Sequence, residues 1–486
     1  MIKKIVISIA AFCIGTTIMT RREVFGRSFM FTRPASASVT MREQAWHLIK
    51  YRAKDSLSGI YGIVYGEHSR HVDKCDKYFL FNNKRTLLVA GDMAAPDLTR
   101  ARDIRAEWLQ LPDDFSGSLR MRPTQRQYGF LLGYHQPLCT VTDISFLQDS
   151  WFDFQLPFAW VQNDLHLTQQ DINNPGTTFP RDILEAFNNP AWRFAKISGK
   201  RSRFGIANLR IEFGKTYLAQ DFFEIAYYSF LVLPLSGLPD PEHFFDPVVD
   251  YNSHAGFGGG VHMQIPLTRC DYMAHSLFMN LESVYLFHRK QKRTFDLKDA
   301  MSGRAKPWSR FMLFNVQKGP PNQNIPGVNL LTREVTAHLY GVVDFCVGYR
   351  LTHEMVEFEI GYGIWGHSDE KLRFKEPSFT LFEPFGIAGA NNDPNNPTTS
   401  SNSTISTLQP NNSVFTPITL FDIDRCSAAA PSAFMQRIHV AVACAGTDDK
   451  CQRLNASIGI GGFVELPNSN SPLPMWGGWV NAGVVF

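Results

Sequence analysis

Four adjacent residues, Tyr251-Asn252-Ser253-His254, carry the side-chain types of a nucleophilic hydrolase. A serine nucleophile needs a histidine base within hydrogen-bond reach and a third group that orients this histidine. Side chains that follow one another along a chain cannot form such a line, and His367-Ser368-Asp369 fails for the same reason. We therefore assign no catalytic residue and expect no enzyme.

Metal ions and cofactors are not predicted either. The 14 histidines show no ligand spacing and no C-x-x-C motif occurs. Gly258-Gly259-Gly260 is not followed by the Lys-Ser/Thr pair of a phosphate-binding loop. Cys444 and Cys451 flank an expected tight turn, which predicts a disulfide across that hairpin in an oxidising compartment. The formal net charge of +3 gives no reason to expect nucleic acid as a partner.

Charged residues alternate with apolar ones along several segments. Residues 335–350 and 356–364 place apolar side chains at every second position, and the same pattern recurs at residues 208–213, 434–442 and 454–465. This period predicts β-strands. If the apolar faces meet lipid, the polar faces line a lumen. The pore-lining candidates are then Arg210, Glu212, Asp344, Arg350, Glu357, Glu359, Arg437 and His439.

Connection lengths distinguish the two ends of the predicted strands. Counting back from the C-terminus, short turns alternate with longer links, which include loops near residues 288–334 and 366–432. Outer-membrane barrels have short turns on the periplasmic side and long loops outside. Further upstream, we expect residues 199–201 to form a short outer link and residues 159–189 a long inner one. Proline, which lacks an N–H, is expected to mark strand ends at Pro137, Pro157, Pro234 and Pro266.

The segments define a fold class and three regions. Further strands at residues 151–156, 128–135, 85–90 and 59–65 bring the total to about 14, within a range of about 12–16. The prediction is an all-β, transmembrane, antiparallel, up-and-down barrel formed by residues 58–486. Residues 21–57 would form a plug or a first strand, since residues 42–55 could make a short amphipathic helix. Residues 1–20, with Lys3 and Lys4 before an uncharged apolar run, predict a signal peptide with an uncertain cleavage site.

The C-terminal strand carries the resemblance to a known class. Val480, Ala482, Val484 and Phe486 lie on one apolar face, and the chain ends on the aromatic residue. This resembles the C-terminal signature of bacterial outer-membrane β-barrel proteins, whether porin-like or of the kind that takes up hydrophobic compounds. The resemblance implies that Phe486 is an assembly signal for the barrel-assembly machinery.

Composition fits such a barrel. Mean hydropathy is −0.17, and aromatic residues make up 13% of the chain, which suits aromatic girdles at the two membrane interfaces. We expect an outer-membrane channel for passive or facilitated diffusion of small solutes, with the lipid bilayer and those solutes as partners. One alternative is a closed structural or adhesive barrel that makes contacts through the Asn-, Pro-, Ser- and Thr-rich residues 388–413. Another is an outer-membrane hydrolase. The oligomeric state is unknown from sequence.

Overall fold

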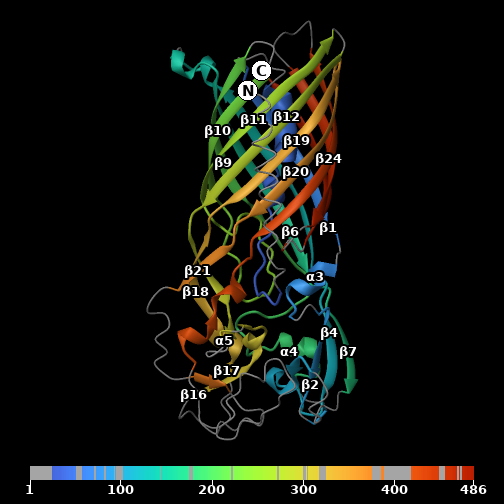
Figure 1. The fold of residues 1–486 in the computed structure, drawn as a ribbon, viewed down its shortest axis with the longest axis vertical. Coiled ribbons are helices and arrows are strands. Elements are labelled where there is room, and N and C mark those ends of the chain that lie inside the picture. Colours follow the sequence, from blue (N-terminus) through green and yellow to red (C-terminus); the bar gives the residue numbers. More distant parts are fainter. Residues whose placement is uncertain are drawn as a thin grey trace.

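The fold is a closed antiparallel β-barrel with a second unit of small sheets at one end (Figure 1). The computed structural model describes residues 25–486 except 51–56, 71–72, 82–83, 92, 95–101, 143, 174–178, 220–222, 271–272, 299–302, 304, 317–324, 375–384, 388–417, 448–454, 468–469 and 471–472. The predicted signal peptide and the loop at residues 388–413 therefore lie outside the described residues.

Twelve strands close the barrel, because the first strand pairs with the last. β1 pairs with β26 from Gly59↔Val485 to Ser69↔Met475, and β5 pairs with both β1 and β6. The strands, in chain order, are β1 (Gly59–Ser69), β5 (Thr124–Pro137), β6 (Ser150–Asp164), β9 (Asn208–Ala219), β10 (Phe223–Pro234), β11 (Gly256–Cys270), β12 (Met273–Leu286), β19 (Val342–His353), β20 (Val356–His367), β24 (Ala433–Thr447), β25 (Asn455–Pro467) and β26 (Met475–Val485).

One further strand, β8 (Arg201–Ile206), lies outside the closed ring. It pairs with residues 158–163 of β6, whereas β9 pairs with residues 150–155 of the same strand. The break between β8 and β9 falls at Ala207, whose N–H donates to the carbonyl of Pro157 at 3.0 Å. Pro157 has no N–H to return a bond, so the ladder is interrupted there. Our expectation that Pro157 ends a strand is therefore wrong: it lies inside β6 and breaks the partner strand instead.

The estimate of about 14 strands is too high, although twelve is the lower limit of the expected range. Residues 85–90 contribute β2 (Thr86–Ala90), which belongs to a small sheet outside the barrel. Residues 335–350 are two strands, β18 (Thr332–Leu339) outside the ring and β19 within it. Alternation alone does not distinguish these cases, because a small sheet with one buried face has the same period.

The connections are sorted between the two ends of the barrel. Five pairs of successive strands, β5 with β6, β9 with β10, β11 with β12, β19 with β20 and β24 with β25, are connected at the end that carries Phe486. The links at residues 70–123, 165–207, 235–255, 287–341, 368–432 and 468–474 meet at the other end. Residues 159–164 complete β6, and the chain passes from β6 to β8 at the end with the long links. The long inner link expected at residues 159–189 is therefore wrong, whereas residues 199–201 do lie at the end with the long links.

The long links build the second unit, which occupies the lower half of Figure 1. It holds four small sheets: β2 with β3 (Ile104–Arg105), β4 (Ser116–Arg120) and β7 (Thr168–Asn173); β13 (Arg289–Thr294) with β18 and β21 (Glu370–Phe374); β14 (Asp296–Lys298) with β15 (Ala305–Lys306) and β23 (Ile423–Asp424); and β16 (Leu313–Val316) with β17 (Ile325–Pro326) and β22 (Phe385–Ile387). Its helices are α3 (Asp73–Tyr78), α4 (Ile183–Phe187) and α5 (Gly327–Leu331).

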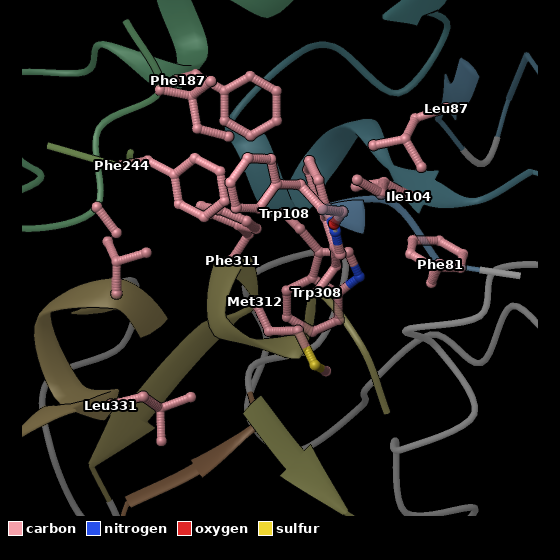
Figure 2. Packing of buried hydrophobic residues seen from close by; sticks show 14 of the residues in the cluster. Phe81, Leu87, Ile104, Trp108, Phe187, Phe244, Trp308, Phe311, Met312 and Leu331 are labelled. Carbon is pink, nitrogen blue, oxygen red and sulfur yellow. Dashed lines mark hydrogen bonds between the residues drawn. The ribbon is translucent and has the colours of Figure 1, made fainter. Parts of the chain in front are cut away.

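An apolar core holds this unit together. The ring of Phe187 packs edge to face against Trp308 and Phe311, which are tilted relative to each other (Figure 2). The centroids of Phe187 and Phe311 are 5.4 Å apart. Trp308 Nε1 donates to the carbonyl of Phe79 at 2.7 Å, so its one polar atom is satisfied in the core. Aromatic pairs of this geometry add stability beyond the area that they bury. The long links thus form a packed unit with its own hydrophobic core.

The chain runs through the barrel before it forms the wall. Residues near Gly26 contact the small-sheet unit, where Gly26 N donates to the carbonyl of Tyr78. Helix α2 (Val39–Lys50) then lies within the ring, in contact with β1, β12, β19, β25 and β26. The chain reaches β1 at the opposite end, where Phe486 N donates to the carbonyl of Ser58. We call residues 31–50 the luminal segment.

Candidate functional site

The barrel strands have polar inner faces and apolar outer faces. On β20, Glu357 and Glu359 are 2% and 5% exposed, whereas Phe358 and Ile360 are 48% and 55% exposed. On β24, Arg437 and His439 are buried and Ile438 and Val440 are exposed. A water-soluble protein would reverse this arrangement, since an aliphatic side chain left in water loses about 1.5–3 kcal/mol of transfer free energy.

Lipid is the solvent that suits such an outer face. A closed ring leaves no backbone N–H or C=O unpaired at an edge, which lipid requires. The chain has the architecture of a bacterial outer-membrane β-barrel. Barrels of this class place short turns in the periplasm, so we expect the small-sheet unit on the outer side. Among the described residues, no helix is long and apolar enough to span a membrane.

The interior of the barrel is the candidate site, and the luminal segment fills it. Polar groups of residues 33–47 form hydrogen bonds or ion pairs with side chains of β1, β5, β9, β11, β12, β19, β20, β24, β25 and β26. Contacts thus run almost completely around the ring. They fall into three charged clusters and one aromatic contact.

The first cluster surrounds Arg42. Its guanidinium donates to both carboxylate oxygens of Glu282 on β12, at 2.6 and 3.2 Å. Arg210 on β9 reaches the same carboxylate at 2.8 Å and also pairs with Glu212, while Arg42 lies 3.7 Å from Glu212. The hydroxyl of Tyr228 donates to Glu282 at 2.8 Å. Two arginines and two carboxylates balance one another here, so no net charge is left buried.

The second cluster surrounds Arg350 on β19, which is fully buried. It pairs with Glu43 of α2 at 2.9 Å, with Glu357 at 3.2 Å and with Glu359 at 2.8 Å. One guanidinium therefore faces three carboxylates. Three imidazoles complete the group: His439 Nε2 lies 2.9 Å from Glu359, His47 Nε2 lies 3.1 Å from Glu357, and His262 Nδ1 lies 3.6 Å from Glu43.

The third cluster joins the segment before α2 to the outer part of the barrel. Arg33 pairs with Glu67 on β1 at 2.8 Å and with Glu465 on β25 at 3.1 Å. Arg437 pairs with the same Glu465 at 2.8 Å and donates to the hydroxyls of Ser38 and Thr40. The cluster pins the turn that leads into α2.

Aromatic packing adds to these polar contacts. The ring of Trp46 lies 5.7 Å from Trp151 of β6 and 4.8 Å from His262 of β11. Beside them, a cavity of about 20 Å³ is lined by Arg42, Trp46, Glu212 and Glu282 among others, which is room for a single water. Around this contact, the described side chains therefore leave little free space in the interior.

All eight pore-lining candidates have buried side chains and belong to these clusters or adjoin them. Seven of them are members of the three charged clusters described above. The eighth, Asp344, accepts a hydrogen bond from the backbone N–H of Val39 at 3.2 Å. Whether they line a conducting pore stays a prediction.

Sequence reasoning missed the partners of these residues. Arg33, Arg42 and Glu43 precede the first strand, and Glu282 and Glu465 are single acids in otherwise apolar or small-residue stretches. The signal available in the sequence was that residues 42–55 carry charges on a possible helix, while several predicted strands carry charges on one face. Nothing in the sequence shows which helical charge meets which strand.

Other predicted positions can be placed only in part. Phe486 is half exposed at the end of β26, and its role in assembly stays a prediction. Cys444 is exposed on β24, whereas Cys451 lies outside the described residues, so their disulfide also stays a prediction. Ser253 Oγ donates to the carbonyl of Ser236, and His254 Nδ1 contacts the carbonyl of Phe287. These two side chains thus have separate backbone partners.

One group could bring three ligand atoms together at the outer rim. Asp240, Glu242 and His243 lie within 4.8 Å of one another. Glu242 already pairs with Lys196 at 2.9 Å, and burial is the main cause that lowers the pKa of His243. The ion pair accounts for Glu242, and Asp240 accepts a hydrogen bond from the backbone N–H of Glu242, so we assign no metal to them.

Comparison with known proteins identifies no family. No family model and no curated protein sequence matches the chain. An outer-membrane channel from Pseudomonas putida F1 is 9% identical, with 88% of this chain and 95% of that chain covered and a TM-score of 0.34. The toluene transporter TodX from Pseudomonas putida is 8% identical, with 96% and 98% covered and a TM-score of 0.30. The translocator domain of the autotransporter NalP from Neisseria meningitidis is 8% identical, with 92% and 95% covered and a TM-score of 0.29.

Proposed function

We propose that the protein is an outer-membrane channel for small solutes, with a preference for cations, that its own luminal segment holds closed. The observation that carries this proposal is the charge lining of the barrel interior. A barrel that stays permanently closed can fill its lumen with apolar side chains. Buried ion pairs add little net stability over such a filling, because desolvation offsets their attraction.

A charged lining suits a lumen that alternates between two states. With the luminal segment in place, the wall charges pair with the segment and with one another. With the segment displaced, water can solvate the same groups, whereas an apolar wall would resist hydration. The lining is therefore compatible with both a closed and a water-filled lumen.

The balance of charge on the wall gives the expected selectivity. Among the described residues, the buried ionisable groups of opposite sign on the barrel strands are eight acids, Glu67, Asp153, Glu212, Glu282, Asp344, Glu357, Glu359 and Glu465, and three arginines, Arg210, Arg350 and Arg437. The luminal segment supplies Arg33 and Arg42 to this wall against one acid, Glu43. Its departure leaves an excess of five carboxylates, and rings of acidic groups favour cations.

Displacement of the segment has to keep both of its ends attached. At the outer end, Ser28 Oγ donates to the carbonyl of Thr294 and Arg293 stacks over the ring of Phe29. At the periplasmic end, the chain continues into β1. Opening would therefore move residues 33–47 within the lumen and break the three charged clusters.

The test is single-channel conductance of the full chain in planar bilayers. We expect rare openings for the natural chain and frequent stepwise openings for Arg42→Gln, because the loss of Arg42 removes the partner of Glu282 on the helix. The reversal potential in a salt gradient should have the sign of cation preference. Lys200→Gln, at an exposed outer position, is the matched control. A folded Arg42→Gln barrel that stays silent, or one that prefers anions, contradicts the proposal.

A second candidate function is a closed scaffold that presents the outer unit for surface contacts. The packed aromatic core of the small-sheet unit favours it, since ordinary loops need no such core. Deletion of residues 388–413 should then abolish binding of cells to a surface and leave conductance unchanged. Loss of conductance without loss of adhesion would favour the channel.

A further inference from the structure

The sheet β13-β18-β21 continues the barrel wall beyond its outer rim. Val284 of β12 pairs with Val342 of β19, and five residues further along both strands Arg289 pairs with Ala337. In the same way, the Val342↔His367 pairing of β19 and β20 is followed three residues on by Leu339↔Glu370. The register of strand pairing is thus the same in the barrel wall and in the small sheet. The strands β13, β18 and β21 therefore extend the three wall strands β12, β19 and β20 beyond the rim.

The two faces of this sheet differ in character. Val335, Ala337 and Leu372 are buried in the core of the outer unit. The other face carries exposed or half-buried polar side chains from all three strands. We call its cationic members, Lys290, Lys292, His338, Lys371 and Arg373, the basic face.

Ring contacts join the basic face to the lipid-facing surface of the barrel. Tyr285 is 45% exposed on the outer side of β12, and its ring lies 6.3 Å from that of Tyr340. Lys371 Nζ lies 5.3 Å from the centroid of Tyr340, whose ring stacks on His338 at 5.9 Å. Aromatic side chains of this kind lie at the level of lipid headgroups. The basic face therefore begins at the outer membrane interface.

Three charges of the basic face lack an ion-pair partner among the described residues. Within the described part of the chain, Lys290, Lys371 and Arg373 make no salt bridge, and Glu334, opposite Lys292 in the register, is the one exposed acid of the three strands. Burial, followed by the positive charges of Arg373 and His288, lowers the pKa of His338. Four lysine and arginine side chains against one glutamate leave a local positive charge at the membrane surface.

We propose that the basic face binds the phosphorylated headgroups of outer-leaflet lipids. Phosphate fits lysine and arginine donors in charge and in hydrogen bonding, and the face lies where such headgroups must lie if the adjoining tyrosines are at the interface. The site would fix lipids of high negative charge to one side of the barrel. It is independent of conduction through the lumen.

The test is lipid binding to the full chain in neutral maltoside micelles. Native mass spectrometry counts bound molecules as doubly phosphorylated lipid A is added, and its dephosphorylated form is titrated in parallel. We expect lipid A to bind the natural chain and the Lys371→Gln/Arg373→Gln variant to bind it about thirtyfold more weakly, since each of the two basic side chains near an anionic surface strengthens binding about fivefold. The dephosphorylated lipid should bind both equally weakly.

The matched control removes two charges from the opposite side of the ring. Arg122 and Arg126 are exposed at the outer rim beside β5, six strands away from β19 in the sheet order. Arg122→Gln/Arg126→Gln should bind lipid A as the natural chain does. Equal weakening by both double variants, or unchanged binding after the Lys371→Gln/Arg373→Gln change, would overturn the proposal. Because the four side chains are exposed, both variants are expected to fold.

Discussion

At the residue scale, the interior depends on buried charges that pair with one another. Arg350 serves three carboxylates at once, those of Glu43, Glu357 and Glu359. Removing one member of such a group leaves its partners buried and uncompensated. The penalty is much larger than the net contribution of the intact group.

We therefore expect Arg350→Gln to lower the free energy of unfolding by about 3–5 kcal/mol. Urea titration of the protein in lipid vesicles, followed by tryptophan fluorescence, measures the change. Lys200→Gln, an exposed charge outside the barrel strands, should change it by less than about 0.5 kcal/mol. Similar losses from both substitutions would mean that Arg350 does not hold the interior together.

At the element scale, α2 is positioned by its surroundings. Its polar residues meet wall charges, and Trp46 packs between Trp151 and His262. Twelve residues make a helix that is only marginal in isolation. The helix is accordingly stabilised by the barrel. A change in its packing should therefore destabilise the helix and leave the wall strands folded.

Trp46→Ala should loosen α2 and leave the wall intact, because the cavity costs about 3–5 kcal/mol at this contact. Hydrogen exchange of the α2 amides should accelerate, while the circular dichroism of the strands stays the same. Trp476→Ala is the matched control, since Trp476 is 52% exposed on the outer face of β26. Unchanged exchange in Trp46→Ala would show that the ion pairs alone hold the helix.

In the outer unit, β14 carries a buried acid. Burial raises the pKa of Asp296 to about 6 despite its pairing with Arg310. A folded-state pKa above the unfolded value means that this group favours folding most below about pH 4. That contribution declines as the pH rises toward 6. Amides of β14 should therefore be better protected at pH 5 than at pH 7, after correction for intrinsic exchange rates.

Asp296→Asn should abolish this difference, since asparagine can accept the same hydrogen bonds but does not titrate. A difference between pH 5 and pH 7 that persists in the variant would assign the effect to another group.

At the scale of the whole molecule, closure joins the two ends of the barrel chain. β1 and β26 pair along their full lengths, and Phe486 contributes its backbone N–H to Ser58. The ring of Phe486 is half exposed and is not needed for this bond. Replacing this ring therefore tests assembly in the cell separately from the stability of the finished barrel.

Phe486→Ala should reduce the amount of protein in the outer-membrane fraction of cells several-fold, whereas refolding of the purified chain in detergent should be unaffected. Val484→Ala, on the same face of β26, is the control. Normal membrane amounts of Phe486→Ala would remove Phe486 as an assembly signal, and poor refolding in detergent would assign it a structural role instead.

The sequence by itself determined the class of the protein. Period-two alternation in segments such as residues 356–364, with glutamates opposite Phe358 and Ile360, is a local property of a strand, so it can be read without knowing the neighbours. The same alternation placed the eight charged candidates on one face. It also misled, since residues 85–90 and 335–339 alternate in small sheets outside the ring.

Only the tertiary structure decided what fills the barrel and how many strands form it. Pairing of Arg42 with Glu282, or of Glu43 with Arg350, joins residues more than two hundred positions apart. Such contacts depend on the three-dimensional closure of the ring, and any of several helical charges could have met any of several acids. Strand count depends on hydrogen bonding between strands, which a single strand's pattern does not encode. The physical reason is the same in both cases: alternation is local, whereas closure and packing are not.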